Sequence, residues 1–379
     1  MGLMGPIGLI GLMVFSACSS EQQEGEATVQ QQPVDLVAYT AQPTTRADSS
    51  MLAEPAIPMG KSIGVYAYYH DNSTWAVEDA ADPKRTLPNF MFNQQATNTG
   101  LDLPYTYSPL KYWPNEEEDG VSFIAYYPYS STAAEITRSG ITPLMDNLGL
   151  PPYGVGLPQF RFAVKDDVKQ QVDFLVSDLL PDLHYPDNTR ISDRVRFYFK
   201  HALSKIEFRI IVDEAIRERV AYFTLNGISI TNIYNEGLLT PEYDSGTGET
   251  SLVWSDYSNL HKTDYDCKTT EAYLLLPQAL RNDAHLNISY DLALKADGTV
   301  YQYDGSGNPV AIDDYIYENH DASIQLNTLC VTGTEDLLTE WEPNHHYVYT
   351  IRLSANRIEF TGQVAPWGQY IWEPLTPIE

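Results

Sequence analysis

The stretch VRFYFKHALSKIEFRIIV, residues 195–212, decides the fold. Its apolar side chains alternate with polar ones, at odd positions as far as Leu203 and at even positions from Ile206 onward. Successive side chains of a strand point to opposite faces, so a single strand cannot change parity without an inserted residue. The sequence therefore predicts a long strand-like run with a bulge or bend near residues 202–205.

Other stretches show the same period of two. Alternation recurs at residues 61–69, 121–127, 172–176, 286–294 and 347–353. A second change of parity separates Phe223 and Leu225 from Ile228 and Ile230, with Gly227 between them. The 27 tyrosines, 24 prolines and 23 glycines favour strands and turns, and no long helical period appears. We expect an all-β chain of sandwiches.

The length gives room for two domains. The chain has 379 residues, of which 43% are apolar, so each domain can bury a core. We place a signal peptide at 1–17, an acidic tether at 18–33, an N-terminal sandwich at 34–212 and a C-terminal sandwich at 213–379. The boundary is set in the charged segment 213–219, and 187–193 is the alternative.

Composition excludes several function classes. The formal net charge of −28 opposes binding to nucleic acid or to anionic lipid head groups. The histidines and cysteines show no metal-binding spacing, and no nucleophile motif is present, so we expect neither an enzyme, a cofactor nor a metal. Cys267 and Cys330 either pair in an oxidising compartment or remain buried free thiols, and we favour the thiols.

The N-terminus resembles a signal sequence for export and lipid attachment. An apolar run at 1–17 ends with Ser16 and Ala17 before Cys18, which resembles a bacterial lipobox whose cysteine is acylated. The alternative is an uncleaved or simply secreted N-terminus. A polar, acidic, low-complexity run follows Cys18 and is typical of a flexible tether.

Six short motifs together resemble the fimbrillin-like family of Bacteroidetes, the subunits of pili. They are YSPLKYWP (107–114), VSFIAYYP (121–128), FKHALSKIEF (199–208), YLLLPQ (273–278), YVYTI (347–351) and APW (365–367). The resemblance implies two tandem transthyretin-like β-sandwich domains on an outer-membrane lipoprotein precursor, which is exposed at the surface and enters a fimbrium after processing. Its partners would be other pilus subunits.

The resemblance also implies assembly by strand exchange. A first strand fills a groove in its own subunit, a protease cuts after an arginine, and a neighbour's C-terminal segment fills the vacancy. On this sequence the removable strand would use Val34, Leu36, Ala38 and Thr40. The cut would fall between Arg46 and Ala47, in a loop with nothing apolar to bury the arginine. The alternative is a disordered tether with a chance arginine.

The donor segment would lie in the tail at residues 357–379. Its candidate side chains are Ile358, Phe360, Val364, Trp367 and Ile371. The alternative is that this tail forms ordinary closing strands of the second sandwich.

A second functional hypothesis is a surface adhesin or glycan-binding lipoprotein that does not polymerise. It would bind host or bacterial surface glycans or proteins, at a pilus tip or alone. Exposed aromatic side chains in loops would stack on sugar rings, and Trp75, Trp113 and Trp254 are the candidates.

Overall fold

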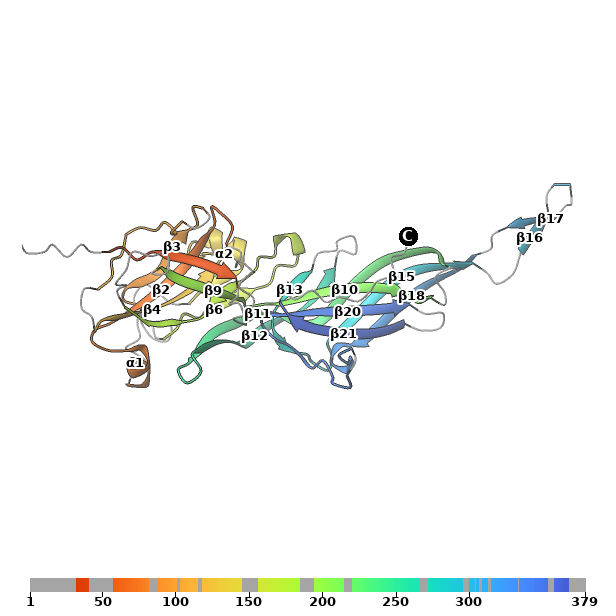
Figure 1. Cartoon of the computed structure of the whole chain (residues 1–379). Coiled ribbons are helices and arrows are strands. Elements are labelled where there is room, and N and C mark those ends of the chain that lie inside the picture. The colour runs from red at the N-terminus through yellow and green to blue at the C-terminus, as the bar shows by residue number, and fades with distance from the viewer. Residues whose placement is uncertain are drawn as a thin grey trace, which may run out of the picture.

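The structure is a computed structural model, elongated and built almost entirely of strands (Figure 1). It describes residues 32–40, 57–81, 88–100, 103–114, 118–144, 156–184, 194–214, 220–265, 272–295, 300–303, 305–306, 309–312, 315–332, 334–353 and 358–367. The all-β prediction is confirmed, and so is the packing of sheets into sandwiches.

A seven-stranded sheet forms the N-terminal part of the molecule. Its order is β1-β9-β7-β4-β2-β3, with β8 paired to β4. The strands are β1 (Leu36–Thr40), β2 (Ser62–His70), β3 (Met91–Thr97), β4 (Gly120–Tyr127), β7 (Leu175–Ser177), β8 (Leu180–Leu183) and β9 (Val195–His201).

Both faces of this sheet are buried. Ile63, Val65 and Ala67 of β2 join one apolar cluster, as the alternation predicts. The opposite positions Tyr66 and Tyr68 join a second cluster, which the alternation did not predict. That second face is covered by β5 (Ile141–Pro143), β6 (Phe160–Ala163) and the end of β11. Burial raises the pKa of the Tyr66 and Tyr68 hydroxyls well above its usual value, so both rings stay neutral inside the core.

Two further sheets make the C-terminal sandwich. One has the order β13-β10-β20-β21 and the other the order β18-β15-β11-β6-β5, with β12 paired to β11. Their new strands are β10 (Ser204–Val212), β11 (Val220–Asp244), β12 (Glu249–Tyr265), β13 (Tyr273–Leu275), β15 (His285–Lys295), β18 (Tyr315–Gln325), β20 (His345–Leu353) and β21 (Ile358–Pro366). Side chains of both sheets share one apolar cluster between them.

The 25-residue strand β11 belongs to both parts of the molecule (Figure 1). Its first half pairs with β15, and Ile228 and Ile230 lie in the C-terminal core. Its second half pairs with β6, and Leu239 lies in the core under the N-terminal sheet. One continuous strand therefore joins the two cores.

Both predicted changes of parity are confirmed. β9 ends at His201 and β10 begins at Ser204, in a different sheet. In β11 the pairing with β15 shifts register between Leu225 and Gly227. The predicted domain boundary near 213–219 stays a prediction, and the pairing of β10 with β13 and β20 points to a division nearer 202–203.

Two short helices were missed by the search for a helical period. They are α1 (Trp75–Ala81) and α2 (Ala133–Ser139), each of seven residues. Such a length is too short to display a period of 3.6. For α2 a local signal existed, because Thr132 and Glu135 form a capping box and Gly140 ends the helix in the left-handed conformation.

Smaller elements complete the chain. Two 3-10 turns lie at Val168–Gln170 and Leu326–Thr328, and β14 (Gln278–Ala279) pairs with β19 (Glu340–Trp341). β16 (Val300–Tyr303) pairs with β17 (Pro309–Ile312), in a hairpin that projects from the far end of the C-terminal sandwich (Figure 1). We predict from the sequence a hairpin turn at 296–299 that would pair β16 with β15. That pairing is wrong, because β15 pairs with β11 and β18.

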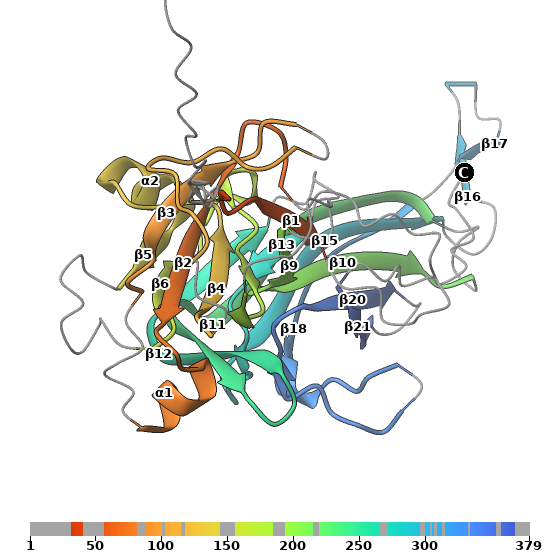
Figure 2. The same cartoon turned by 60° about the vertical axis from the view of Figure 1, so that its left-hand side comes forward.

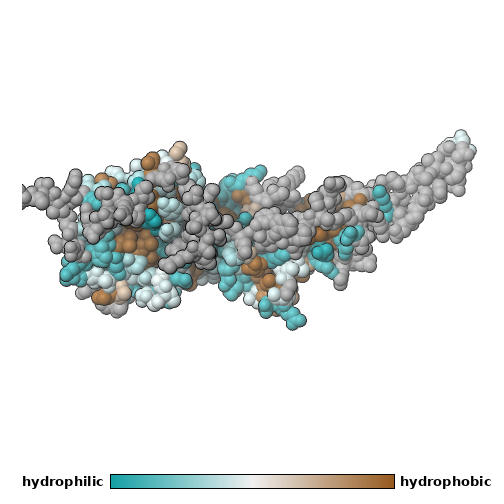
Figure 3. Space-filling model, viewed as in Figure 1, coloured by the Kyte–Doolittle hydropathy of each residue, from teal (hydrophilic) through white to brown (hydrophobic). Residues whose placement is uncertain are grey.

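The surface carries mixed hydropathy. On the face in Figure 3, the apolar residues form separate small patches among hydrophilic ones. None of the helices in the described part of the chain is long and apolar enough to cross a membrane.

The expectation of a buried thiol is wrong for Cys330, which is free and exposed. Its backbone forms an isolated bridge with Leu337 beside β21, and this places the thiol at the rim of a sheet. Cys267 lies outside the described residues.

A partly buried ion pair between β10 and β20 predicts acid sensitivity. Glu207 accepts from His346 Nε2 at 3.1 Å and from Arg209 Nε at 3.0 Å. The contact with His346, followed by the contact with Arg209, lowers the pKa of Glu207 from 4.5 to about 2. Because the folded pKa is the lower one, this stabilisation is complete above pH 4.5 and is lost as the pH falls toward 2.

Replacing Glu207 by glutamine should therefore cost about 1–2 kcal/mol of unfolding free energy at neutral pH, after allowance for partial exposure of the carboxylate. It should also flatten the fall of Tm in acid. Thermal denaturation as a function of pH measures both effects. Glu242→Gln, at an exposed position of β11, is the matched control and should leave the acid profile unchanged. An unchanged profile in Glu207→Gln would contradict the assignment.

Candidate functional site

The first described strand lies at the edge of the N-terminal sheet. β1 pairs in parallel with β9, from Leu36 opposite Val195 to Thr40 opposite Phe199. The Val195 N–H also donates to the Asp35 carbonyl at 2.8 Å. Figure 2 shows β1 beside β9 on the outside of the sheet. The predicted N-terminal strand is thus present, and it closes one edge of its sheet.

The other side of this strand is held by the segment 103–114. Tyr105 N donates to the Leu36 carbonyl at 2.9 Å, and Trp113 N donates to the Gln32 carbonyl at 3.0 Å. In return, Val34 N donates to the Lys111 carbonyl at 2.9 Å. Residues 32–40 therefore occupy a slot with backbone partners on both sides. We call this slot the β1 groove.

A tyrosine side chain adds a further hydrogen bond in the β1 groove. The Tyr107 hydroxyl donates to the Val34 carbonyl at 2.7 Å. Burial raises the pKa of Tyr107 to about 12, so the hydroxyl keeps its proton at neutral pH. In the sequence, residues 107–114 stand out only as a family motif. The alternation of Tyr105 and Tyr107 was the one local sign of its role.

The predicted inward side chains of β1 are buried where the structure describes them. Val34 and Leu36 are 0% exposed and Ala38 is 3% exposed, and all three join the cluster that contains Phe197. Burying them contributes roughly 4–7 kcal/mol as an upper estimate. For Thr40 the structure gives the backbone pairing alone.

The opposite face of β1 differs in part from expectation. Val37 is also buried, at 4% exposure, although alternation places it outward. Tyr39 stacks on Tyr198 of β9 with ring centroids 5.9 Å apart. At the start of the strand, Asp35 and Arg194 lie 4.0 Å apart as a partly exposed ion pair, which is worth little in water.

Three predicted processing residues lie outside the described residues. They are Cys18, the proposed lipid attachment site, and Arg46 and Ala47, which flank the proposed cut. The last described residue before the cut is Thr40, at the end of β1.

The first part of the predicted donor tail forms β21 (Ile358–Pro366). This strand is antiparallel to β20 over nine residue pairs, from Leu353–Ile358 to His345–Pro366. Ile358, Phe360 and Val364 are partly buried against the C-terminal core. In this structure β21 thus closes its own sandwich and is not in the sheet of β1. Ile371 lies outside the described residues.

Trp367 ends the described tail at the junction of the two parts. Its ring stacks on His201, the last residue of β9, with centroids 3.9 Å apart and planes 13° apart. Its backbone N–H donates to the Asn344 carbonyl at 2.8 Å, and the Asn344 N–H donates to the Leu203 carbonyl at 3.2 Å. The described part of the tail therefore ends near the middle of the molecule.

Two of the three proposed aromatic platforms are buried, and the third is partly buried. Trp75 and Trp113 are buried, at 3% and 4% exposure. Trp254 packs against a core cluster and donates its indole N–H to the Ala202 carbonyl at 2.8 Å. The prediction of exposed stacking platforms is wrong for Trp75 and Trp113, and it stays a prediction for Trp254, which lies in strand β12 and not in a loop. Across the described ranges, no group of three or more His, Cys, Asp or Glu side chains is placed to hold a metal ion.

Comparisons with known proteins agree with this architecture. The family model described as fimbrillin-like matches residues 45–367 of the chain. The fimbrium subunit Fim1C of Phocaeicola vulgatus is 24% identical over 400 residues, which cover 95% of each protein. A crystal structure of a fimbrial protein from Bacteroides vulgatus ATCC 8482 is 21% identical, with a TM-score of 0.55. That match covers 88% of this chain and 99% of the other. The chain belongs to the fimbrillin-like family.

Proposed function

We propose that this protein is a structural subunit of a surface pilus that assembles by exchange of β1 for a segment of a neighbouring subunit. It would be exported as an outer-membrane lipoprotein precursor acylated at Cys18. A cut between Arg46 and Ala47 would then release it, and its partners would be other subunits of the pilus. Membership of the fimbrillin-like family and the name of the relative Fim1C support a role in a fimbrium. A role in cell adhesion is part of the same proposal.

The observation that best supports strand exchange is the way in which β1 is held in its groove. Its backbone is paired on both sides, and Val34, Leu36 and Ala38 fill an apolar slot. A strand held only by ladder hydrogen bonds and a few buried side chains can be replaced by another strand of similar pattern. The β1 groove is therefore suited to accept a strand from outside.

Cleavage would decide the direction of exchange. While the chain is intact, the covalent link from β1 to β2 keeps the local concentration of β1 high, and an external strand competes poorly. After a cut at Arg46 that link is gone, and β1 is held by its own contacts alone. An incoming strand with comparable burial can then displace it.

A single cut would also free the subunit from the membrane. Cys18 and β1 lie on the same side of Arg46 in the sequence. The lipid anchor would therefore leave with the resident strand, and opening of the groove would be coupled to release from the outer membrane.

Arginine-specific cleavage tests this proposal. We expect the purified full chain to remain monomeric, and to form oligomers or filaments after nicking at Arg46 with loss of the fragment that contains β1. Size-exclusion chromatography with light scattering, together with mass spectrometry of the released fragment, measures both events.

The matched control is Arg46→Gln under the same protease. It should keep β1 and stay monomeric, which separates the cut at Arg46 from cuts at other arginines. A wild-type protein that is nicked at Arg46, stays monomeric and retains its N-terminal fragment would refute the exchange.

A further inference from the structure

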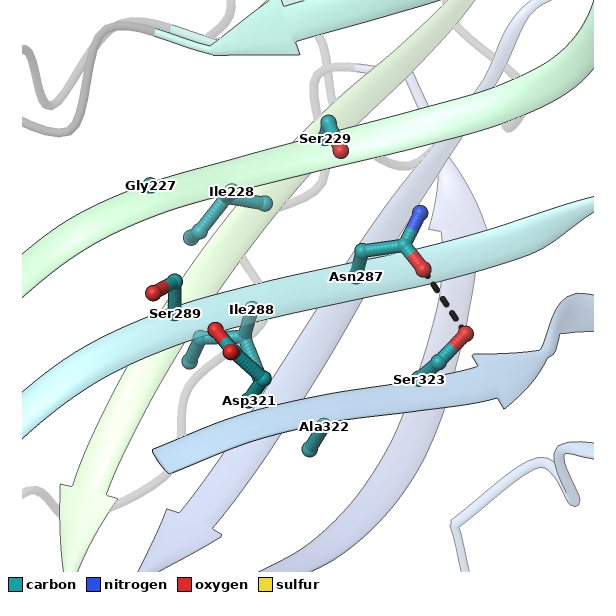
Figure 4. Close-up of a pocket in the computed structure, with 9 residues that line it drawn as sticks. All are labelled: Gly227, Ile228, Ser229, Asn287, Ile288, Ser289, Asp321, Ala322 and Ser323. Atoms are coloured by element: carbon teal, nitrogen blue, oxygen red, sulfur yellow. Dashed lines mark hydrogen bonds between the residues drawn. The ribbon is translucent and has the colours of Figure 1, made fainter. Parts of the chain in front are cut away.

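A shallow hollow lies on the outer face of the sheet that contains β11, β15 and β18. Its volume is about 410 Å³, and it is open to solvent. Figure 4 shows five polar side chains on one side of the three strands, while Ile228, Ile288 and Ala322 point to the other side. The hollow is remote from the β1 groove, which belongs to a different sheet.

The lining follows two neighbouring rows of the β-ladder. Ser229, Asn287 and Ser323 lie opposite one another in the first row. Gly227, Ser289 and Asp321 form the second row. Strands are about 4.8 Å apart, and the two rows are about 7 Å apart along the strands. The result is a regular grid of small polar groups, two rows deep and three strands wide.

The bulge in β11 places a glycine in this grid. The register shift lies between Leu225 and Gly227, at the position where the sequence changes parity. At Gly227 an added Cβ would meet nothing within 4 Å, so the space above this position is open. Ser229 is only 8% exposed although it faces outward, so the grid has a recessed floor. Bulges often occur where a strand is shaped for binding.

The chemistry of the lining selects a class of ligand. The hydroxyls of Ser229 and Ser289 can each donate and accept a hydrogen bond, and the Ser323 hydroxyl, whose proton is donated to Asn287, can accept one. Asn287 is oriented, because its Oδ1 accepts from the Ser323 hydroxyl at 2.7 Å (Figure 4). Its Nδ2 donates one N–H to the His285 carbonyl at 3.5 Å, which leaves the second N–H for a ligand. Asp321 forms no ion pair with the described part of the chain, and its carboxylate can accept from two hydroxyls at once.

The charge of the lining excludes anionic ligands. The nine lining residues include no Lys or Arg, and the chain carries a formal charge of −28, so an anion would be repelled. The lining also contains no aromatic ring, so a ligand would have no ring to stack on.

We propose that this hollow, the 227–323 grid, binds a neutral saccharide through its hydroxyl groups. A carboxylate, an oriented amide and three hydroxyls match the paired donors and acceptors of vicinal diols. An open site without a stacking platform binds a single sugar weakly. If the protein polymerises as proposed above, repetition of the site along the filament raises the avidity by about 10²–10⁴-fold. The saccharide site itself does not depend on polymerisation.

Filling the hollow tests the site. Saturation-transfer difference NMR on the uncleaved monomer should show contact with at least one of D-galactose, D-mannose, L-fucose, N-acetylglucosamine and N-acetylgalactosamine, each tested alone. Gly227→Val should reduce the signal at least tenfold without loss of Tm, because the valine enters open space and favours a strand. Asp321→Asn should weaken the same signal with little change in shape.

Ser251→Val, at an exposed position of β12 outside the grid, is the matched control and should bind like wild type. Glycerol gives the background signal. The proposal would be overturned if none of the five sugars gave a signal above that background with the wild-type protein. Gly227→Val with undiminished signal would also overturn it. Because the monomer is used, either failure leaves strand exchange untouched, and failure of assembly after cleavage leaves the saccharide site untouched.

Discussion

Replacing Leu36 by aspartate is expected to expel β1 from its groove. Leu36 is fully buried in the N-terminal core, and an uncompensated carboxylate there costs several kcal/mol on top of the lost apolar burial. The total, about 4–6 kcal/mol, is comparable to the whole contribution of the three buried β1 side chains. Amide hydrogen exchange across residues 195–199 of β9 should lose its protection, because β1 is the neighbour of β9 at this edge.

The matched control places the same charge on the other face of β1. Tyr39 is only partly buried and stacks on Tyr198, so Tyr39→Asp should leave β9 protected. After cleavage, Leu36→Asp should also assemble faster than wild type, since the resident strand no longer competes. Full protection of β9 in Leu36→Asp would mean that β1 is not held by its apolar side chains.

Truncating the tail after β21 is expected to abolish assembly and to leave the fold intact. Removal of residues 368–379 should leave a folded monomer that no longer polymerises after nicking, because the free end of the proposed donor is gone. Removal of residues 358–379 takes away a strand with nine pairs to β20 and three side chains on the core. That second truncation should lower Tm strongly. Circular dichroism melts and light scattering after cleavage distinguish the two outcomes.

A nicked 1–367 chain that still forms filaments would contradict a donor role for the last twelve residues. The same chain can act as an acceptor only, so its mixture with wild-type subunits should still give short oligomers. Absence of these would indicate that the truncation damages the β1 groove and not the donor.

The changes of hydrophobic parity could be predicted because they are local. Between Leu203 and Ile206, and again at Gly227, the sequence itself records that one strand cannot keep a single face buried. At the first change of parity, between Leu203 and Ile206, the structure shows more than a bulge, because β9 and β10 enter different sheets. Sequence alternation reports which side of a strand is apolar, and it does not report which partner covers it.

Features that depend on distant pairing were not predictable in the same way. Tyr66 and Tyr68 read as the outer face of β2, and they are buried because β6 and the end of β11 cover them. The second side of β1 is hydrogen-bonded by segment 103–114, about 70 residues downstream. These bonds use backbone groups, which every residue possesses, so the sequence does not mark them. In the same way, nothing in the tail sequence indicates that Trp367 stacks on His201.

The passage of β11 through both cores has a mechanical consequence. A pull along the long axis loads the hydrogen bonds of β11 with β15 and β6 in shear, so that many bonds must break together and not one after another. Bending at the junction is resisted by an extended backbone and by the ladder to β12, which runs beside β11 across the same region. A subunit built in this way transmits force as a stiff rod, whatever holds it to its neighbours.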